Sequence, residues 1–133
     1  MEEIRIERNL NPDIQKLREE VFVKEQQVPI ELEIEQDEDE YLHCCIYLGG
    51  ILISYARASE GHIGRVCVKR GYRHQGFGEK IMYIAEQQIS SKEIQIHAQV
   101  QARGFYESLG YQVYGKEFME AGIRHIAMRK IRE

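Results

Sequence analysis

The order of hydrophobic and polar residues predicts a strand followed by a helix at the start of the chain. The first isoleucines alternate with charged residues, a period of two that is typical of a half-buried strand. Asn11 and Pro12 indicate a helix start, because asparagine caps helices and proline is tolerated in the first turn. Apolar residues keep helical spacing through Val23, and Pro29 disfavours helix before it, so the helix should end near residues 24–26.

Runs of β-branched and apolar residues predict the strands of a sheet. Residues 41–48 and 51–58 are two such runs, and Gly49 and Gly50 between them suit a hairpin turn. A strand at residues 62–68 runs directly into a glycine-containing loop and then a helix. The remaining expected elements are strands at 94–100, 111–114 and 122–130 and a helix at 102–109 ended by Gly110 in the left-handed conformation.

Residues 31–40 break this pattern. Seven of these ten residues are acidic. Mutual repulsion and the lack of apolar surface predict an extended, solvated loop with no regular element, although its negative field would also attract a polyamine or a lysine-like amine.

Composition and charge narrow the classes of function. A net charge of −4 argues against nucleic acid as a partner and suits a cationic or neutral substrate. The apolar runs are too short to cross a bilayer, and the N-terminal residues lack the pattern of a signal peptide. Three cysteines, two of them adjacent, indicate reduced thiols. We therefore expect a cytoplasmic protein with no membrane partner.

The glycine loop carries the clearest chemical signal. Two glycines separated by one residue let the backbone approach a phosphate, and the following helix directs its free N–H groups at the same point. The other interpretation of this spacing is a tight strand-to-helix turn. A Walker loop is absent, and Ile81 stands where a dinucleotide fingerprint needs its third glycine, so neither ATP nor NAD is indicated.

Two segments resemble the GNAT superfamily of acetyltransferases. Arg73, Gly76 and Gly78 match its acetyl-CoA loop, Arg/Gln-x-x-Gly-x-Gly/Ala. Residues 99–111 are similar to its Asn-x-x-Ala-x-x-x-Tyr-x-x-x-Gly-Phe segment, with glutamine and tyrosine at the two ends in place of asparagine and phenylalanine. Residues 17–29 and 118–125 resemble the ElaA-like or YjcF-like branch, which often has proline where Arg124 stands.

This resemblance implies the fold and the cofactor. The expected fold is a single α/β (α+β) domain over residues 1–133, with a mixed, mostly antiparallel sheet of six or seven strands, splayed central strands and helices on both faces. The cofactor is acetyl-CoA, with coenzyme A as the product. Its pantetheine arm would pair with backbone groups of one splayed strand, and a backbone N–H there would stabilise the thioester oxygen. The implied cofactor-binding residues are Val66, Cys67, Val68, Arg73, His74, Gln75, Gly76, Phe77, Gly78, Gln99 and Arg103.

The same resemblance points to catalytic residues. Tyr106 stands at the family's tyrosine position and is the candidate general acid for the departing thiolate, the alternative being a packing tyrosine with its hydroxyl at the surface. Its neighbour Phe105 is expected in the core. The residues chemically suited to be the general base are Glu25, His43, His97, Glu120 and His125. Glu120 and His125 rank first, because they lie in the segment that resembles the ElaA-like branch.

Other residues are candidates for the acceptor site or for alternative chemistry. Arg18, Glu25 and His43 are candidate substrate-binding residues, with an exposed ion pair as the other interpretation of the first two. Cys67 would permit a covalent acetyl carrier, or it is simply a small apolar residue of a buried strand. Neither calcium nor zinc spacing is present, so no metal is expected.

The predicted function is direct acetyl transfer from acetyl-CoA to an amine of a small molecule or peptide. The alternatives are a non-catalytic acyl-CoA sensor or interaction module, and an acyltransferase that uses another acyl-CoA or a non-amine acceptor. A homodimer is left open.

Overall fold

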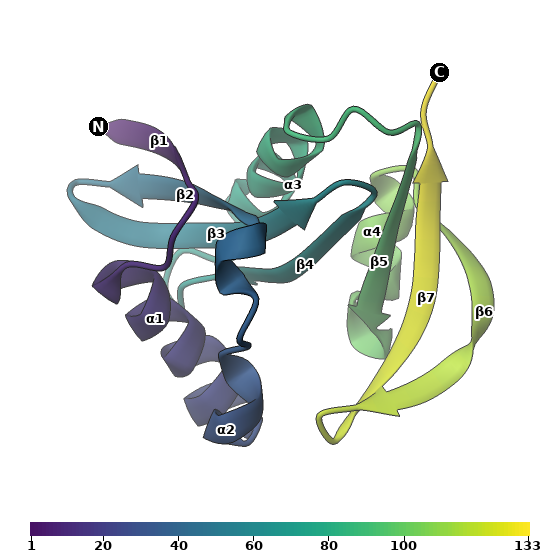
Figure 1. Cartoon of the computed structure of the whole chain (residues 1–133), viewed down its shortest axis with the longest axis horizontal. Coiled ribbons are helices and arrows are strands. Elements are labelled where there is room, and N and C mark those ends of the chain that lie inside the picture. Colours follow the sequence, from purple (N-terminus) through teal and green to yellow (C-terminus); the bar gives the residue numbers. More distant parts are fainter.

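The computed structural model describes all 133 residues and contains one mixed sheet of seven strands (Figure 1). The strands run in the order β1-β2-β3-β4-β5-β7-β6, and every neighbouring pair is antiparallel except β4 and β5, which are parallel. Their bounds are β1 Glu2–Glu7, β2 Leu42–Leu48, β3 Ile51–Ser59, β4 His62–Val68, β5 Glu93–Gln99, β6 Gln112–Glu120 and β7 Ile123–Ile131.

Helices cover both faces of the sheet. The first face carries α1 Pro12–Arg18, the π-helical turn η1 Glu19–Glu25, α2 Ile30–Glu33 and the 3₁₀ turn η2 Glu38–Glu40. The opposite face carries α3 Phe77–Gln87, the 3₁₀ turn η3 Val100–Ala102 and α4 Arg103–Ser108. None of these helices is both long and apolar enough to span a membrane.

Two separate cores lie on the two faces, because successive residues of a strand point to opposite sides. The larger core joins the sheet to α3 and α4, and the smaller one joins α1 and η1 to β2 and β3. The adjacent residues Cys44 and Cys45 illustrate the alternation, since Cys44 lies in the larger core and Cys45 in the smaller. All three cysteines are buried free thiols.

Local signals in the sequence correctly predicted several element ends. The side chain of Asn11 accepts a hydrogen bond from the Ile14 N–H at 2.8 Å, so it caps α1 as expected. Gly49 and Gly50 have φ of +59° and +81° in the β2–β3 turn, and Gly110 has φ of +96° after α4. These positive values are the ones that glycine adopts at little cost.

Three predictions were wrong. Residues 31–40 are not a structureless, solvated loop, because they include the end of α2 and all of η2, and Glu33 and Glu38 are buried. The sixth strand is longer than residues 111–114, since β6 continues to Glu120 by pairing with β7. Phe105 does not belong to the core: it is 37% exposed and packs against the start of α3.

Candidate active site

The parallel strands β4 and β5 separate soon after they meet. Their only residue pair is His62 with Gln95, supported by a 2.8 Å hydrogen bond from the Gln95 N–H to the Gly61 carbonyl. Beyond this point each strand keeps its outer neighbour, β3 or β7, and loses the inner one. The sheet therefore opens in the middle, and Figure 1 shows the two strands diverging.

A bulge in β4 adds to this opening. Arg65 has φ of +52°, and the register between β3 and β4 shifts at this position. The Lys69 N–H donates to the Ile53 carbonyl of β3 at 2.7 Å. Because backbone groups alternate in direction along a strand, those of Val66 and Val68 point into the opening. The edge of β4 thus offers backbone groups for pairing with an extended ligand, except the Val68 carbonyl, which accepts a hydrogen bond from the Arg73 side chain.

The glycine loop follows β4 at one end of the opening. Gly76 precedes α3 with φ of +89°, and its carbonyl accepts the first helical hydrogen bond, from the Lys80 N–H at 3.0 Å. The backbone N–H groups of residues 73–76 make no hydrogen bond within the protein. A Cβ atom added to Gly78 would lie 3.2 Å from the Phe105 ring, so glycine permits close packing of α3 on α4. These features are typical of an anion-binding loop.

Arg73 is not directed at the open side of this loop. Its Nε donates to the Val68 carbonyl at 2.9 Å, and its two terminal nitrogens bind the Glu25 carboxylate at 2.9 and 2.8 Å. The hydrogen bonds from Arg73 lower the pKa of Glu25. The arrangement ties the end of η1 to the loop. In this conformation only the backbone N–H of Arg73, and not its guanidinium fork, is available to a phosphate.

Tyr106 lies on α4, and Cys67 lies on β4, the strand that borders the opening. Burial raises the pKa of the Tyr106 hydroxyl above its usual value of about 10, and the nearby Cys67 adds to this shift. Burial also raises the pKa of the Cys67 thiol to about 12. Both groups are therefore protonated at neutral pH, so the hydroxyl can donate a proton, whereas the thiol is a poor nucleophile.

The two polar residues of the second cofactor segment have protein partners. The Gln99 amide donates to the Gln26 side chain at 2.7 Å, which links β5 to the end of η1 across the opening. Arg103 is exposed on α4 and pairs with Glu107 at 3.3 Å. Gln99 therefore closes one end of the opening, and Arg103 lies at the surface of the α4 side.

Arg18 and His43 are buried in an ion-pair network and expose no atom to an acceptor. Arg18 binds Glu33 at 2.6 Å and Glu38 at 2.8 Å, which raises the pKa of the guanidinium although burial alone would lower it. His43 contacts the Tyr55 hydroxyl and the Glu38 carbonyl, and burial lowers the pKa of its imidazole. The exposed ion pair considered for Arg18 is therefore wrong, because its partners are buried.

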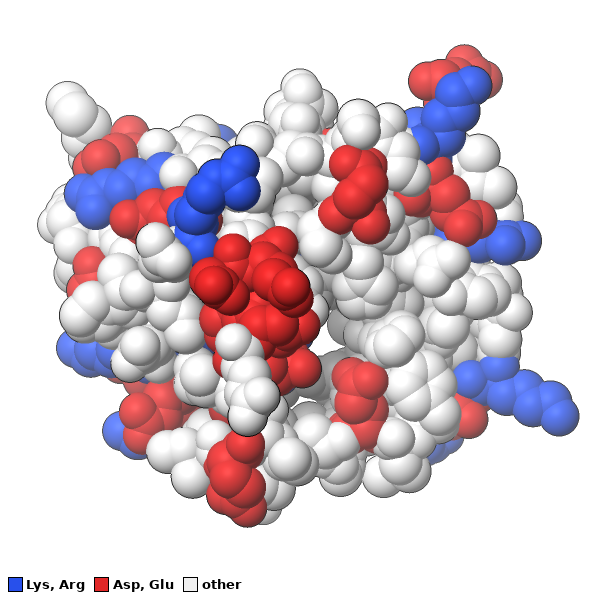
Figure 2. Space-filling view, viewed as in Figure 1, with Lys and Arg blue, Asp and Glu red and all other residues white.

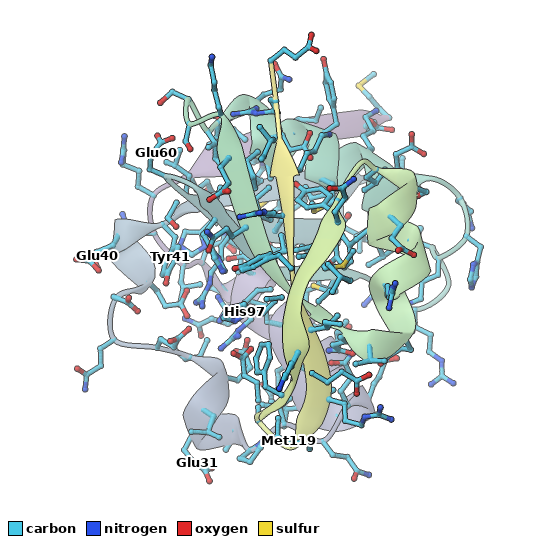
Figure 3. The ribbon with its side chains drawn as sticks, turned by 90° about the vertical axis from the view of Figure 1, so that its right-hand side faces the viewer. Glu31, Glu40, Tyr41, Glu60, His97 and Met119 are labelled. Atoms are coloured by element: carbon cyan, nitrogen blue, oxygen red, sulfur yellow. The ribbon has the colours of Figure 1, made fainter.

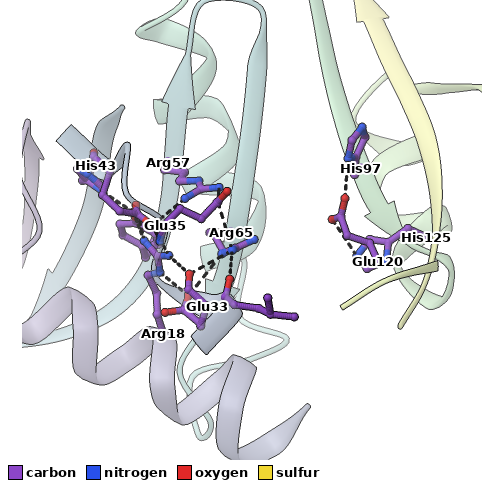
Figure 4. Close-up of polar contacts among 12 residues, drawn as sticks. Arg18, Glu33, Glu35, His43, Arg57, Arg65, His97, Glu120 and His125 are labelled. Carbon is purple, nitrogen blue, oxygen red and sulfur yellow. Dashed lines mark hydrogen bonds and ion pairs between the residues drawn. The ribbon is translucent and has the colours of Figure 1, made fainter. Parts of the chain in front are cut away.

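Two further arginines complete this network, and the sequence analysis missed them. Arg57 of β3 pairs with Glu35 and Glu38, and Arg65 of the β4 bulge pairs with Glu33 and Glu35. The Arg65 Nε is the one buried side-chain polar atom without a hydrogen bond, although it lies 3.4 Å from Glu33. Figure 4 shows these residues together on the α2 side. The sequence does contain a signal for this network, since Arg57 and Arg65 stand inside strands that are otherwise mostly apolar. A buried charge requires a partner of opposite charge, so these arginines predict acidic residues nearby.

A second polar cluster lies across the opening, on the far half of the sheet. The Glu120 carboxylate of β6 lies 3.1 Å from the His97 Nδ1 of β5 and 3.8 Å from the His125 Nε2 of β7. Figure 4 shows these two contacts apart from the Arg18 network. The structure thus brings Glu120 and His125 together, as their shared segment suggested, and adds His97. Glu25 pairs with Arg73 and does not join either cluster.

Figures 2 and 3 show the α2 side of the molecule from two directions. Figure 2 shows a hollow in the middle of the α2 face, with a dense group of acidic side chains along one edge. In Figure 3 the α2 helix, marked by Glu31, and the β6–β7 hairpin, marked by Met119, lie at the same end of the molecule. The α2 side therefore carries the acidic side chains of α2 and η2, and the His97–Glu120 pair lies on the other half of the sheet.

Sequence comparison supports the interpretation of this geometry. Residues 10–132 match a family model described as an acetyltransferase (GNAT) domain. The chain is 39% identical over 122 residues to the Bacillus subtilis protein called uncharacterized N-acetyltransferase YjcF, which covers 86% of this chain and 87% of that protein. It is 34% identical over 125 residues to the B. subtilis protein YyaT, covering 86% and 84% of the two chains.

Solved structures share the same architecture. Escherichia coli ElaA superposes with a TM-score of 0.83 at 27% identity, covering 98% of this chain and 99% of that one. An aminoglycoside 6'-N-acetyltransferase complexed with coenzyme A superposes with a TM-score of 0.69 at 13% identity, covering 96% of each chain. The second likeness concerns the fold alone.

Proposed function

The chain belongs to the GNAT acetyltransferase family, and on that premise we propose that it is an acetyl-CoA-dependent N-acetyltransferase that acts on an amine of a small molecule or peptide. The observation that carries the proposal is the opening between β4 and β5, which ends at a loop with unpaired backbone N–H groups. An unpaired strand edge presents a row of free backbone groups that can pair with another extended chain or ligand.

The residues around the opening fit coenzyme A. The free N–H groups of residues 73–76 and the N-terminus of α3 favour the pyrophosphate, because both direct positive dipoles at the same point. The free edge of β4 fits the pantetheine amides. The full proposed set is Val66, Cys67, Val68, Arg73, His74, Gln75, Gly76, Phe77, Gly78, Gln99 and Arg103.

Catalysis divides between the two faces of the sheet. When bound, acetyl-CoA supplies an activated acetyl group. Tyr106, on the α4 face, donates its phenolic proton to the sulfur that leaves, since burial keeps this hydroxyl protonated. The acceptor amine enters from the α2 face, where the cluster that Glu120 forms with His97 and His125 supplies groups able to take up a proton. An amine of the lysine type has a pKa of about 10.4, so it must lose a proton before it can attack.

Calorimetric titration with acetyl-CoA tests the cofactor assignment directly. Acetyl-CoA is expected to bind with one-to-one stoichiometry, whereas ATP, which lacks the pantetheine arm, is expected to bind far more weakly. Thiol release is then followed in the same sample with a panel of primary amines. Amine-dependent release supports a transferase, no acetyl-CoA binding refutes the cofactor, and binding without release for any amine refutes amine transfer.

A further inference from the structure

Glu120 holds two histidines that come from different strands. His97 lies on β5 and His125 on β7, and the Glu120 carboxylate contacts one ring nitrogen of each, at 3.1 and 3.8 Å (Figure 4). The Phe118 ring lies between the two imidazoles, edge-on to His97 with centroids 5.1 Å apart and stacked on His125 at 5.9 Å. These contacts fix the orientation of both rings.

The hydrogen bonds of His125 mark it as the supporting histidine. Its Nδ1 lies 2.7 Å from the Ile123 carbonyl, which can only accept, so Nδ1 carries a proton. Its Nε2 faces the Glu120 carboxylate. With Nδ1 protonated, the Nε2 lies 3.8 Å from the Glu120 carboxylate, which is beyond hydrogen-bond distance, and the side chain is 9% exposed. His125 therefore packs against Glu120 inside the cluster, but its burial leaves it little access to a substrate.

His97 has the opposite arrangement. Its Nδ1 is the nitrogen that contacts the Glu120 carboxylate, and an ionised carboxylate only accepts, so the Nδ1 of a neutral His97 carries the proton. Its Nε2 makes no hydrogen bond within the protein and keeps its lone pair. The side chain is 43% exposed. A carboxylate that fixes the tautomer of an imidazole and leaves Nε2 basic is the arrangement of a general base.

The position of His97 matches this role. It lies two residues beyond Gln95, where the pairing of β4 and β5 ends, so it stands at the edge of the opening. Its neighbours Ile96 and Ala98 belong to the core on the α4 side, so the His97 ring points to the α2 face. His62 of β4 touches the ring edge-on at 5.3 Å, and burial lowers the pKa of His62.

We propose that His97 is the general base of the transfer and that Glu120 and His125 are positioning residues. This inference rests on the proposed function. The acceptor amine first loses one proton to water and attacks in its neutral form. Its nitrogen forms a bond to the acetyl carbonyl carbon, the His97 Nε2 accepts the second proton that this nitrogen loses, and the carbon–sulfur bond breaks. The electron pair of that bond goes to sulfur, which takes the Tyr106 proton. His97 then returns its proton to water, and Tyr106 regains one.

The first test needs no acceptor. Long-range proton–nitrogen spectra of ¹⁵N-histidine-labelled protein report the tautomer of each neutral ring, with His97→Gln used to assign the signal. Wild type and the control Glu117→Ala, which removes an exposed carboxylate of the same strand, are expected to hold His97 protonated at Nδ1. Glu120→Ala is expected to lose this preference. A wild-type His97 protonated at Nε2 would overturn the proposal.

The second test uses thiol release with the best amine of the panel between pH 5.5 and 9. His97→Gln is expected to lower kcat about 10²- to 10⁴-fold and to abolish the acid limb of the pH profile, with acetyl-CoA affinity unchanged. Glu120→Ala is expected to lower kcat less and to keep that limb. The charged or titratable neighbours of His97 are His62, Glu120 and His125. An acid limb that persists in His97→Gln would therefore be attributed to one of these three groups.

The outcomes separate the two proposals. A His97→Gln enzyme as active as wild type, with Glu120→Ala inactive, would make Glu120 the base and overturn the role of His97. Failure of the wild type to release thiol with any amine would refute the proposed function. The tautomer spectra would still decide whether Glu120 positions His97.

Discussion

At the scale of single residues, the environment of Tyr106 indicates whether its buried hydroxyl can act as a proton donor or as a proton acceptor. Burial raises its pKa, so at neutral pH the hydroxyl donates a proton and does not accept one. The structure shows no hydrogen bond from this hydroxyl to the protein, so it is free to reach a ligand.

Replacing Tyr106 by phenylalanine keeps the packing and removes the proton. We expect Tyr106→Phe to lower kcat by about 10²-fold or more, because general acid catalysis typically contributes 10²–10⁴-fold. Acetyl-CoA affinity in calorimetry should stay the same, because the ring remains. Equal turnover in variant and parent would exclude Tyr106 as the acid.

Cys67 is expected to be dispensable. A thiol whose burial raises its pKa to about 12 is almost entirely protonated at neutral pH, and only the thiolate is an effective nucleophile. Cys67→Ala should therefore retain turnover with an amine acceptor. Intact-mass spectra after mixing the wild type with acetyl-CoA should show no acetylated protein. An acetyl adduct that disappears in Cys67→Ala would instead support a covalent route.

At the scale of elements, the segment from α2 to η2 shows why a local charge pattern was misleading. Its seven acidic residues were treated as mutually repelling, but Glu33, Glu35 and Glu38 face arginines that come from α1, β3 and β4. Those partners are 15 or more residues away in sequence, so no local window contains them. The network holds α2 and η2 against the sheet and so shapes one wall of the proposed acceptor side.

Removing the central arginine should loosen this segment. Arg18→Met leaves Glu33 and Glu38 buried without their main partner, and breaking such a pair typically costs about 3–5 kcal/mol of unfolding free energy. Urea unfolding measures the loss. Arg5→Met, which breaks an exposed pair with Glu3, is the control and should change stability little. Equal effects of the two changes would show that the buried network adds no more than a surface pair.

The glycine loop makes a prediction at the same scale. Gly76 has φ of +89°, a conformation that costs an L-residue about 1 kcal/mol or more. Gly76→Val should therefore distort the loop and weaken acetyl-CoA binding in calorimetry. Gly104, in α4, has no atom within 4 Å of an added Cβ and no positive φ. Gly104→Ala is the control, and a similar loss of binding in both variants would contradict a specific role for Gly76.

At the scale of the whole molecule, the two halves of the site differ in how far the sequence reveals them. Most of the proposed cofactor side is contiguous, from Val66 to Gly78, so spacing and resemblance alone suggest it, with Gln99 and Arg103 added from the second segment. The acceptor side is assembled by strand pairing, since β7 aligns His125 with Gln99 on β5 and with Phe118 on β6. The sequence identified His97 as one of several chemically suitable bases but gave no reason to prefer it. The reason is its contact with Glu120, which only the folded structure shows.

At the scale of the whole molecule, the free energy of unfolding should decrease as the pH falls. Burial alone would raise the pKa of Glu38, but hydrogen bonds from Arg18 and the Glu35 N–H, with the charge of Arg57, lower it to about 2. The unfolded chain therefore binds this proton more readily than the folded one. The carboxylate stabilises the fold fully above pH 4.5, and the contribution, about 3 kcal/mol for a shift from 4.5 to about 2, is lost as the pH falls toward 2.

The buried His43 and the half-buried His62 lower the stability in the same direction at a higher pH. Burial lowers the pKa values of His43 and His62 below the ordinary 6.5, so protonation of the unfolded chain already weakens the fold below that pH. Urea midpoints should therefore fall in two stages, below pH 6.5 and below pH 4.5. Glu38→Gln should be less stable than wild type at pH 7 and approach it near pH 2. A constant difference across this range would show that the buried carboxylate, held by arginines from two parts of the chain, is not the group that titrates.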